Sequence, residues 1–394
     1  MAGRRSEDAL DAWMPRLARF ARLGRGLDLP RVGRAVRALS LGLTRERRLA
    51  GEGYLDRPDS LAAYLLFYWP ISYAQVRALL PELPAPRRVL DFGGGAGPAA
   101  FACLDAGAGE ARLVDRSRPA LDAARALARE VASPLSVERR TVPGPLPDGS
   151  FDLIVVQHLV NELWAGEPDA LVRRVALARS LLSRLSPGGT LLLVDPALRE
   201  TSRDLLVLRD ALVAGGAAVR APCLFRGPCP ALARPADWCH AERPWEPPRL
   251  VAEIARAAGL HKEALKMCAV AFASPGEPWP EAPAGRVLRI VSEPLSGKGR
   301  RRYVGCGPEG RFGLSLQDKH VGPGNALFGQ LARGDVIRAS GLTARGDGLR
   351  IEADSVVVRL ARAGEPAPSA PHPRRGAEGE RPRSPGGASR SPGP

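Results

Sequence analysis

Lysine is scarce in this sequence: only Lys262, Lys266, Lys298 and Lys319 are lysines among its 57 basic residues. Arginine therefore carries nearly all of the formal net charge of +15. A planar guanidinium binds phosphate through two hydrogen bonds, so an excess carried by arginine favours a nucleic-acid backbone as partner. The alternative is that a GC-rich genome and solubility account for the arginines. The uneven distribution of the basic residues favours the first explanation.

Long apolar runs are also missing. No run approaches the ~20 residues that a membrane span needs, and the first residues, MAGRRSED, lack the apolar core of a secretory signal. We therefore expect a cytoplasmic protein, monomeric and without a membrane partner. In that reducing compartment the six cysteines are poor candidates for disulfides, and clustered cysteines indicate a metal site instead.

Residues 1–83 are expected to form a basic helical region. Positions 1 to 50 hold twelve arginines against five acidic residues. Arg31, Arg34 and Arg37 recur at every third position, which places them along one stripe of a helix. The stripe fits either phosphate binding or an ordinary solvated helix face. The more apolar stretch from Ser60 to Leu80 is expected to pack on the next domain.

Residues 84–274 alternate short apolar runs with segments of helical period. This alternation predicts an α/β fold with a parallel, doubly wound sheet. An insertion at 222–268 is rich in cysteine and proline. The expected strands are 88–91, 111–115, 151–156, 190–195 and 264–272.

Beyond a proline-rich linker at 275–285 the hydrophobic period changes to two. Five short strands with glycine-rich turns are expected in 286–360, which predicts a small β-barrel of the OB type, a frequent nucleic-acid module. An unspecialised β domain is the alternative. The tail, 361–394, is rich in Pro, Arg, Gly and Ser, and is expected to be disordered.

A glycine-rich loop follows the first expected strand, in the segment VLDFGGGAG from Val89 to Gly97. A dinucleotide fingerprint, Gly-x-Gly-x-x-Gly, would need glycine where Pro98 stands. The string instead resembles motif I of class I methyltransferases, which bind S-adenosyl-L-methionine (SAM). By that resemblance the loop lines the methionine part of SAM and Asp115 holds the ribose. The candidate cofactor-binding residues are Asp91, Gly93, Gly95, Gly97, Asp115 and Gln157.

No catalytic residue is assigned. The segment QHLVNELW, Gln157 to Trp164, lacks the Asn/Asp-Pro-Pro-aromatic box that positions an amino group for base N-methylation. His158 is either a general base or a structural residue. Pro-Cys steps after the fifth strand stand in the wrong place for a cytosine C5 methyltransferase.

Four cysteines form a candidate metal site with the spacing C-x5-C-x9-C-x28-C: Cys223, Cys229, Cys239 and Cys268. Four thiolates suit tetrahedral zinc or a four-iron, four-sulfur (4Fe-4S) cluster. The absence of paired C-x2-C knuckles leans toward iron–sulfur, and His240 leaves a mixed ligand set open. Buried free cysteines are the remaining alternative. Cys103 and Cys306 are interpreted as structural.

The chain from Tyr54 to Leu360 resembles the methyltransferase-like small-ribosomal-subunit assembly family. The segments that carry the resemblance are YLDRPDSLAAY, VLDFGGGAG, PCLFRGPCP and WCH. The resemblance implies a SAM-binding class I Rossmann-like domain with a helical N-terminal extension, a 4Fe-4S cluster on the four cysteines, and association with small-subunit rRNA.

Three functions fit these features. The first is a SAM-dependent, iron–sulfur, rRNA-binding methyltransferase-like protein of small ribosomal subunit assembly or translation. The second is a non-catalytic RNA-binding assembly factor with a relic SAM pocket. The third is a small-molecule SAM methyltransferase with a structural zinc site. The sequence leaves open whether methyl transfer occurs.

Overall fold

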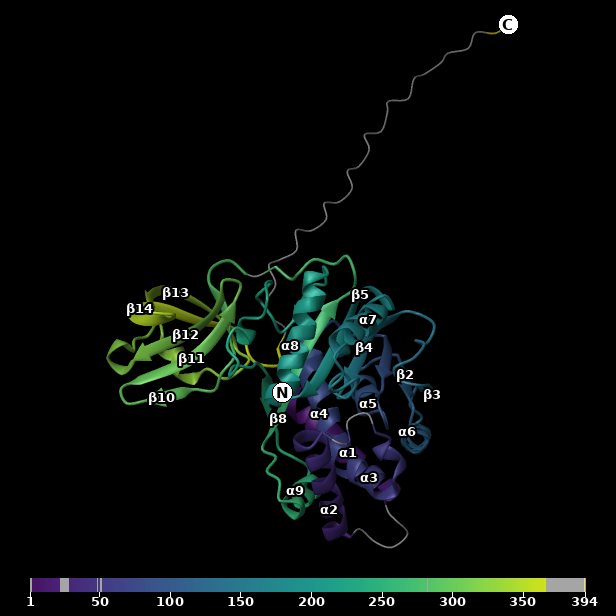
Figure 1. Cartoon of the computed structure of the whole chain (residues 1–394). Helices are drawn as coiled ribbons and strands as arrows, with labels where there is room; N and C mark the ends of the chain where they lie inside the picture. Colours follow the sequence, from purple (N-terminus) through teal and green to yellow (C-terminus); the bar gives the residue numbers. More distant parts are fainter. Residues whose placement is uncertain are drawn as a thin grey trace.

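The computed structural model describes residues 2–21, 28–47, 49, 52–281, 283–365 and 393. In Figure 1 the N-terminal helices lie below the α/β domain, and the C-terminal barrel lies to its left. Most of the tail predicted to be disordered lies outside the described residues. Within the described part, no helix is both long and apolar enough to cross a membrane.

The central sheet has the strand order β3-β2-β1-β4-β5-β8-β6, with β7 paired to β8. The first five strands of that order run parallel, whereas β8 runs antiparallel to β5. The predicted α/β doubly wound class is confirmed, but the sheet is mixed and not wholly parallel as predicted, because β8 pairs antiparallel with β5, β6 and β7. The strands are β1 (Arg88–Phe92), β2 (Glu110–Asp115), β3 (Leu135–Arg139), β4 (Phe151–Gln157), β5 (Leu185–Pro196), β6 (Val219–Ala221), β7 (Ala241–Pro244) and β8 (Ala264–Ala273).

Helices cover both faces of this sheet, so its central strands are buried on both sides and consist of nearly continuous apolar runs. One apolar core includes side chains of the N-terminal helices, α5, α6 and α9; the other includes side chains of α7 and α8. Edge strand β3 is only half-buried, so its sequence has a weak apolar pattern. For this reason no strand was predicted there. The helices are α5 (Pro98–Asp105), α6 (Arg118–Glu130), α7 (Ala170–Leu182), α8 (Arg199–Ala214) and α9 (Arg249–Ala258).

The N-terminal region is helical, as predicted, and shares its apolar core with the sheet. Trp69 is fully buried, which confirms that the stretch Ser60 to Leu80 packs on the α/β domain. The π-turn Tyr64–Tyr68 joins two α-helices within this stretch. The elements are α1 (Ala2–Ala21), α2 (Leu29–Ser40), the π-turn Leu41–Arg45, the 3₁₀ turn Tyr54–Asp56, α3 (Pro58–Ala63), α4 (Trp69–Leu79) and the 3₁₀ turn Leu80–Glu82.

The cysteine-rich insertion between β6 and β7 is held against α8 by two arginines. Arg203 donates to the carbonyl oxygens of Ala231 and Arg234. Arg209, also on α8, donates to the carbonyl of Phe225 at 2.5 Å. These side chains fix a segment that has little regular structure of its own, apart from the 3₁₀ turn Pro230–Leu232.

The C-terminal strands form a closed barrel. The order β11-β12-β14-β13-β9 closes because β9 also pairs with β11, and β12 runs parallel to β14 while the other pairs are antiparallel. The predicted small OB-like barrel is therefore confirmed. Its elements are β9 (Val287–Ile290), β10 (Leu295–Gly297), β11 (Arg300–Gly307), β12 (Gly310–Gln317), the 3₁₀ turns Asp318–His320 and Ala326–Gln330, β13 (Val336–Arg345) and β14 (Gly348–Ala361).

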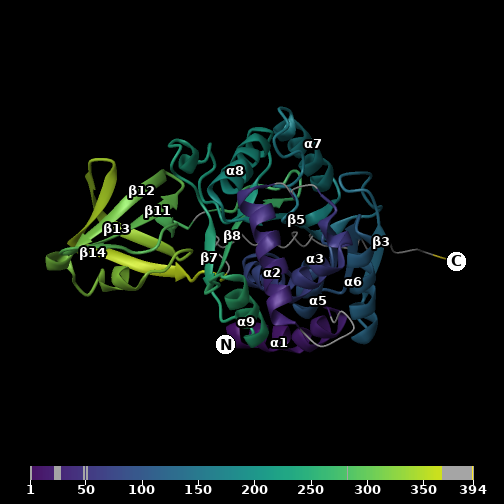
Figure 2. The ribbon, with the colours of Figure 1, turned by 60° about the horizontal axis from the view of Figure 1, so that its bottom comes forward.

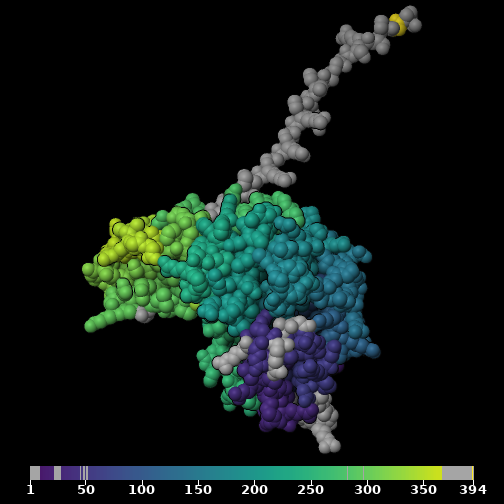
Figure 3. Space-filling model, viewed as in Figure 1, coloured from purple at the N-terminus to yellow at the C-terminus, as the bar shows by residue number. Residues whose placement is uncertain are grey.

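A buried ion-pair triad fastens the barrel to the rest of the chain. Glu82, which ends the N-terminal region, pairs with Arg243 of β7 and with Arg289 of β9. All three side chains are less than a tenth exposed, so breaking one pair would leave an unpaired buried charge. The space-filling view shows the barrel surface abutting the α/β domain (Figure 3).

Candidate functional site

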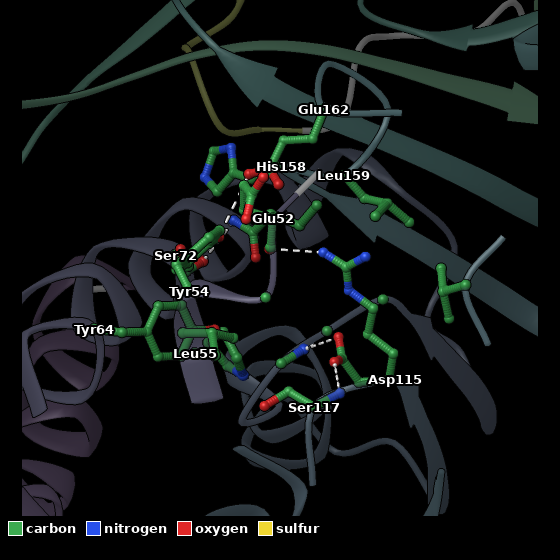
Figure 4. Close-up of a pocket in the computed structure, with 18 of the residues that line it drawn as sticks. Glu52, Tyr54, Leu55, Tyr64, Ser72, Asp115, Ser117, His158, Leu159 and Glu162 are labelled. Atoms are coloured by element: carbon green, nitrogen blue, oxygen red, sulfur yellow. Dashed lines mark hydrogen bonds between the residues drawn. The ribbon is translucent and has the colours of Figure 1, made fainter. Parts of the chain in front are cut away.

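A cavity opens at the carboxyl ends of β1, β2 and β4, where the carboxyl ends of parallel strands form the usual ligand crevice. Of the predicted cofactor residues, Gly93, Gly95, Asp115 and Gln157 line it. Other lining residues come from the N-terminal region and from the segment after β4: Glu52, Tyr54, Leu55, Tyr64, Ser72, His158, Leu159 and Glu162. Figure 4 shows these side chains around the cavity.

The glycine loop requires glycine at Gly93 and Gly95. Both residues have positive φ, +76° and +57°, a backbone conformation that L side chains rarely adopt. A Cβ at Gly95 would lie 2.9 Å from the Tyr64 hydroxyl, and one at Gly93 would lie 2.5 Å from Leu159 Cδ2. The loop thus approaches its neighbours too closely for any side chain.

Asp115 ties the loop to the second strand. Its carboxylate accepts hydrogen bonds from the backbone N–H of Gly95 at 2.8 Å and from that of Ser117 at 2.8 Å. Burial raises the pKa of Asp115, while these hydrogen bonds oppose that shift. The carboxylate therefore stands at the cavity wall, where it can accept ribose hydroxyls.

Asp91 and Gly97 support the loop from behind and do not line the cavity. The Asp91 carboxylate is fully buried and accepts a hydrogen bond from the Ala100 N–H at 3.0 Å. Its Oδ1 has no partner among the described residues. Burial raises the pKa of Asp91 to about 7.

Asp91→Asn should change how stability depends on pH. The native state binds a proton at Asp91 more tightly than the unfolded chain, so this contribution to stability is present below about pH 4 and lost as pH rises through about 7. Between those values we expect the wild type to lose free energy of unfolding relative to Asp91→Asn. Urea unfolding of both proteins across that range measures the difference; parallel curves would contradict it.

A strap formed by Glu52–Asp56 crosses the cavity. Arg116 donates to the Glu52 carbonyl at 2.6 Å, and the Ser117 hydroxyl donates to Asp56 Oδ1 at 2.7 Å. The Tyr54 hydroxyl donates to Glu162 Oε1 at 3.4 Å. The strap was not predicted as part of the site; the segment YLDRPDSLAAY was its only signal in the sequence.

His158 stands at the end of β4 with its tautomer defined by its neighbours. Gln75 Nε2 donates to the Lys266 carbonyl, so Gln75 Oε1 accepts, and His158 Nε2 donates to it at 2.9 Å. His158 Nδ1 is then an acceptor, without a partner among the residues described. Burial, with a smaller effect of Lys262, lowers the pKa of His158 to about 4, so the imidazole is neutral near pH 7. Its φ of +57° is a strained conformation of a kind that clusters at functional sites.

Gln157 has two hydrogen bonds that hold α4 against the sheet. Its Nε2 donates to the Ser72 carbonyl at 3.0 Å and to Gln75 Oε1 at 3.1 Å. The amide nitrogen of this predicted cofactor residue is thus already engaged by the protein, which leaves its oxygen to face a ligand.

A second cavity lies between the insertion, α8 and the barrel. Three of the four predicted metal ligands line it: Cys223, Cys229 and Cys239. The fourth thiol in its wall belongs to Cys306 of β11, which the sequence analysis interpreted as structural. Three arginines also line it, Arg209, Arg289 and Arg311. Each of them pairs with a carboxylate: Arg209 with Asp210, Arg289 with Glu82 and Arg311 with Asp237.

Cys268 lies near Cys239 and Cys223 but outside the lining of this cavity. It is buried in the apolar core on β8, and its Sγ faces the Ser202 carbonyl oxygen at 3.9 Å. It does not line the second cavity. In the part of the chain that is described, no group of three or more His, Cys, Asp or Glu side chains is positioned to hold a metal ion.

Burial raises the pKa of each thiol in this cavity, that of Cys229 to about 11 and that of Cys239 to about 12. The Arg209 guanidinium opposes this effect at Cys223. Arg209 itself is almost fully buried, and its Nε lacks a hydrogen-bond partner in the described chain. The Arg209 guanidinium is itself paired with the Asp210 carboxylate at 2.6 Å.

Comparison with solved structures finds methyltransferases of low similarity. The CcbJ methyltransferase of Streptomyces caelestis is 24% identical over 32% of this chain and 47% of its own, with a TM-score of 0.25. The mitomycin 7-O-methyltransferase MmcR is 23% identical over 48% and 60%, with a TM-score of 0.34. The ribosomal protein L11 methylase of Lactobacillus delbrueckii subsp. bulgaricus is 20% identical over 38% and 69%, with a TM-score of 0.30.

The chain spans about half the length of the first of these structures, and such low scores transfer no activity or substrate. No curated protein matches the chain. The model of the family described as mitochondrial small ribosomal subunit Rsm22 matches residues 58–338. Because that match covers well over half of the 394 residues, the predicted family is confirmed: the chain belongs to the Rsm22 family.

Proposed function

We propose that this chain is a SAM-dependent methyltransferase-like protein that binds small-subunit rRNA and acts in small ribosomal subunit assembly or translation. The family description, which names the small ribosomal subunit, supports the ribosomal part. The observation that carries the cofactor part is the hydrogen bond from the Gly95 amide to Asp115 at the carboxyl edge of a methyltransferase-type sheet. A cytoplasmic location and a monomeric state belong to the same proposal.

Several residues at or behind the cavity have a role in this proposal. Bound SAM supplies an electrophilic methyl group. Gly93 and Gly95 leave room for its methionine part, Asp115 accepts the ribose hydroxyls, and Asp91 holds the loop from behind. His158 lines the cavity with a neutral imidazole, but its Nδ1 is buried and its Nε2 is bonded to Gln75, so no catalytic role is assigned to it.

Asp115→Ala should weaken SAM binding by about 1.5–3 kcal/mol, the size of a hydrogen bond to a charged group. Calorimetric titration of the full chain with SAM measures this loss. Asp122→Ala is the matched control, because it removes a carboxylate from the exposed surface of α6. Equal SAM affinity in the wild type and in Asp115→Ala would remove Asp115 from the site.

A non-catalytic assembly factor with a retained pocket is the second candidate. The strap favours it, because three hydrogen bonds hold Glu52–Asp56 across the cavity and restrict entry of an RNA base. Methyl transfer from labelled SAM to immature small-subunit particles separates the two candidates. The third, a small-molecule methyltransferase with structural zinc, predicts no salt-dependent RNA affinity.

We further propose a metal centre in the second cavity, ligated by Cys223, Cys229 and Cys239, with Cys306 as the fourth ligand in place of Cys268. The four thiols that line this one cavity support this set, because thiolates are the usual ligands of iron–sulfur and structural zinc centres. A 4Fe-4S cluster is the centre that the family resemblance implies, and zinc is the alternative. The centre would join the insertion to the barrel.

A further inference from the structure

A basic hollow lies on the N-terminal helices, apart from both cavities described above. Its volume is about 490 Å³, and α2 and α3 form its sides; Figure 2 shows these two helices on the face turned forward. Its lining includes the exposed residues Arg31, Arg34, Arg57 and Asp59, and its less exposed apolar floor is formed by Ala35, Leu39 and Leu49. The hollow thus combines guanidinium groups with a small apolar floor.

The packing of α2 directs its arginines to this hollow. The opposite face of α2, with Val32, Gly33 and Val36, is buried. At Gly33 a Cβ would lie 2.8 Å from the Ala257 Cβ, so α2 lies in close contact with the end of α9. Residues 31 and 34 must therefore face outward, toward α3 and Arg57.

Only one of the three arginines is neutralised. Arg31 pairs with Asp59 at 2.8 Å. Arg34 and Arg57 are exposed, and neither has an ion pair among the described residues. Two free guanidinium groups converge on one hollow in a chain that already carries +15, which is a local attraction for an anion.

We propose that this hollow binds single-stranded RNA, with Arg34 and Arg57 on its phosphates and the apolar floor against a base or ribose. This proposal rests on the proposed function, and it identifies the surface that would bind the RNA. Guanidinium groups bind phosphate in a bidentate manner and also stack on bases, and the floor offers a base an apolar surface. An acidic peptide would pair with the arginines but would leave the apolar floor of the hollow without a partner.

The hollow lies close to the cofactor cavity along the chain. Arg57 directly follows the strap, of which residues 52–55 line the cofactor cavity. An RNA strand held at Arg57 is therefore held next to the entrance of that cavity.

The test is RNA binding by the full chain with Arg34→Glu and Arg57→Glu combined. The control combines Arg129→Glu and Arg256→Glu, two exposed arginines of α6 and α9 outside the hollow, with the same change in net charge. The probes are fluorescein-labelled oligouridylate and transcribed small-subunit rRNA, titrated at several salt concentrations. We expect the hollow variant to lose affinity for oligouridylate roughly tenfold or more, with a shallower salt dependence, by about 0.7 in log–log slope per lost phosphate contact.

Each outcome has a distinct meaning. Equal losses in the two double variants would overturn the proposal, since net charge alone would explain them. Labelled polyglutamate that binds as tightly as the RNA and is lost in the hollow variant would overturn it in favour of an acidic protein partner. A wild type that binds neither RNA would refute the rRNA part of the proposed function, whereas a wild type and a hollow variant that bind equally would refute only this surface. Thermal melting and the milder pair Arg34→Gln with Arg57→Gln exclude misfolding as the cause.

Discussion

Cys306→Ser is expected to abolish the metal centre. Anaerobically purified wild type should be brown, with a broad visible absorption, and the variant should be colourless with little bound iron. The physical reason is that Cys306 is the one thiol that the barrel contributes to the second cavity, so its loss leaves an incomplete ligand set. Because metal binding adds to folding free energy, the variant should also melt at a lower temperature. Visible spectra, metal analysis and thermal melts measure these effects.

Cys268→Ser is the matched control for that experiment. Its Sγ faces the Ser202 carbonyl inside the apolar core, so the variant should keep its colour. Colour lost in Cys268→Ser but kept in Cys306→Ser would restore the ligand set predicted from sequence spacing. A colourless, zinc-loaded wild type would instead favour zinc, and a metal-free wild type would refute the centre.

Trp69→Ala is expected to destabilise the protein by about 3–5 kcal/mol, the usual cost of deleting a buried aromatic side chain. Trp69 is fully buried and stacks on Tyr73 at 5.4 Å between ring centroids. Its Nε1 donates to the carbonyl oxygen of Ala96, inside the glycine loop, at 3.1 Å. The same substitution should therefore weaken SAM binding, because the loop loses a support.

Two variants separate packing from hydrogen bonding at this site. Trp69→Phe retains most of the ring but not the N–H, and should cost about 1 kcal/mol from the hydrogen bond plus part of the packing. Trp279→Ala removes a half-buried tryptophan remote from the glycine loop, and should leave SAM affinity unchanged. Urea unfolding and calorimetric titration report the two effects. SAM affinity that is unaltered in Trp69→Ala would show that the loop does not depend on this contact.

The nucleotide loop could be predicted because its parts are close in the chain. The prediction needs only a strand, a glycine run and a second strand that ends in Asp115. Neighbouring parallel strands bring their carboxyl ends to one edge of the sheet, so the glycine run and Asp115 must lie close together. The local pattern does not distinguish Gly95, which lines the cavity, from Gly97 and Asp91, which do not line it. That difference depends on how the loop turns over Tyr64 and Leu55.

The strap could not be predicted from the sequence, for a related reason. Its residues carry no chemical motif, and they reach the cavity only because Arg116 and Ser117 hold Glu52 and Asp56 there. The arginine stripe of α2 was visible in the sequence, but its meaning was open. Only the packing of Gly33 on Ala257, with α3 alongside, turns that stripe into one side of a hollow.

The sequence by itself determined the α/β class, the barrel and the glycine loop, because hydrophobic period and local glycine chemistry act over a few residues. The tertiary structure alone decided the direction of β8 and the grouping of Cys306 with three distant cysteines. Those features depend on how the insertion and the barrel dock, through contacts such as the buried pairs of Glu82. The docking of these segments depends on complementary shape and charge between residues far apart in the chain. The spacing of residues along the sequence therefore cannot predict it.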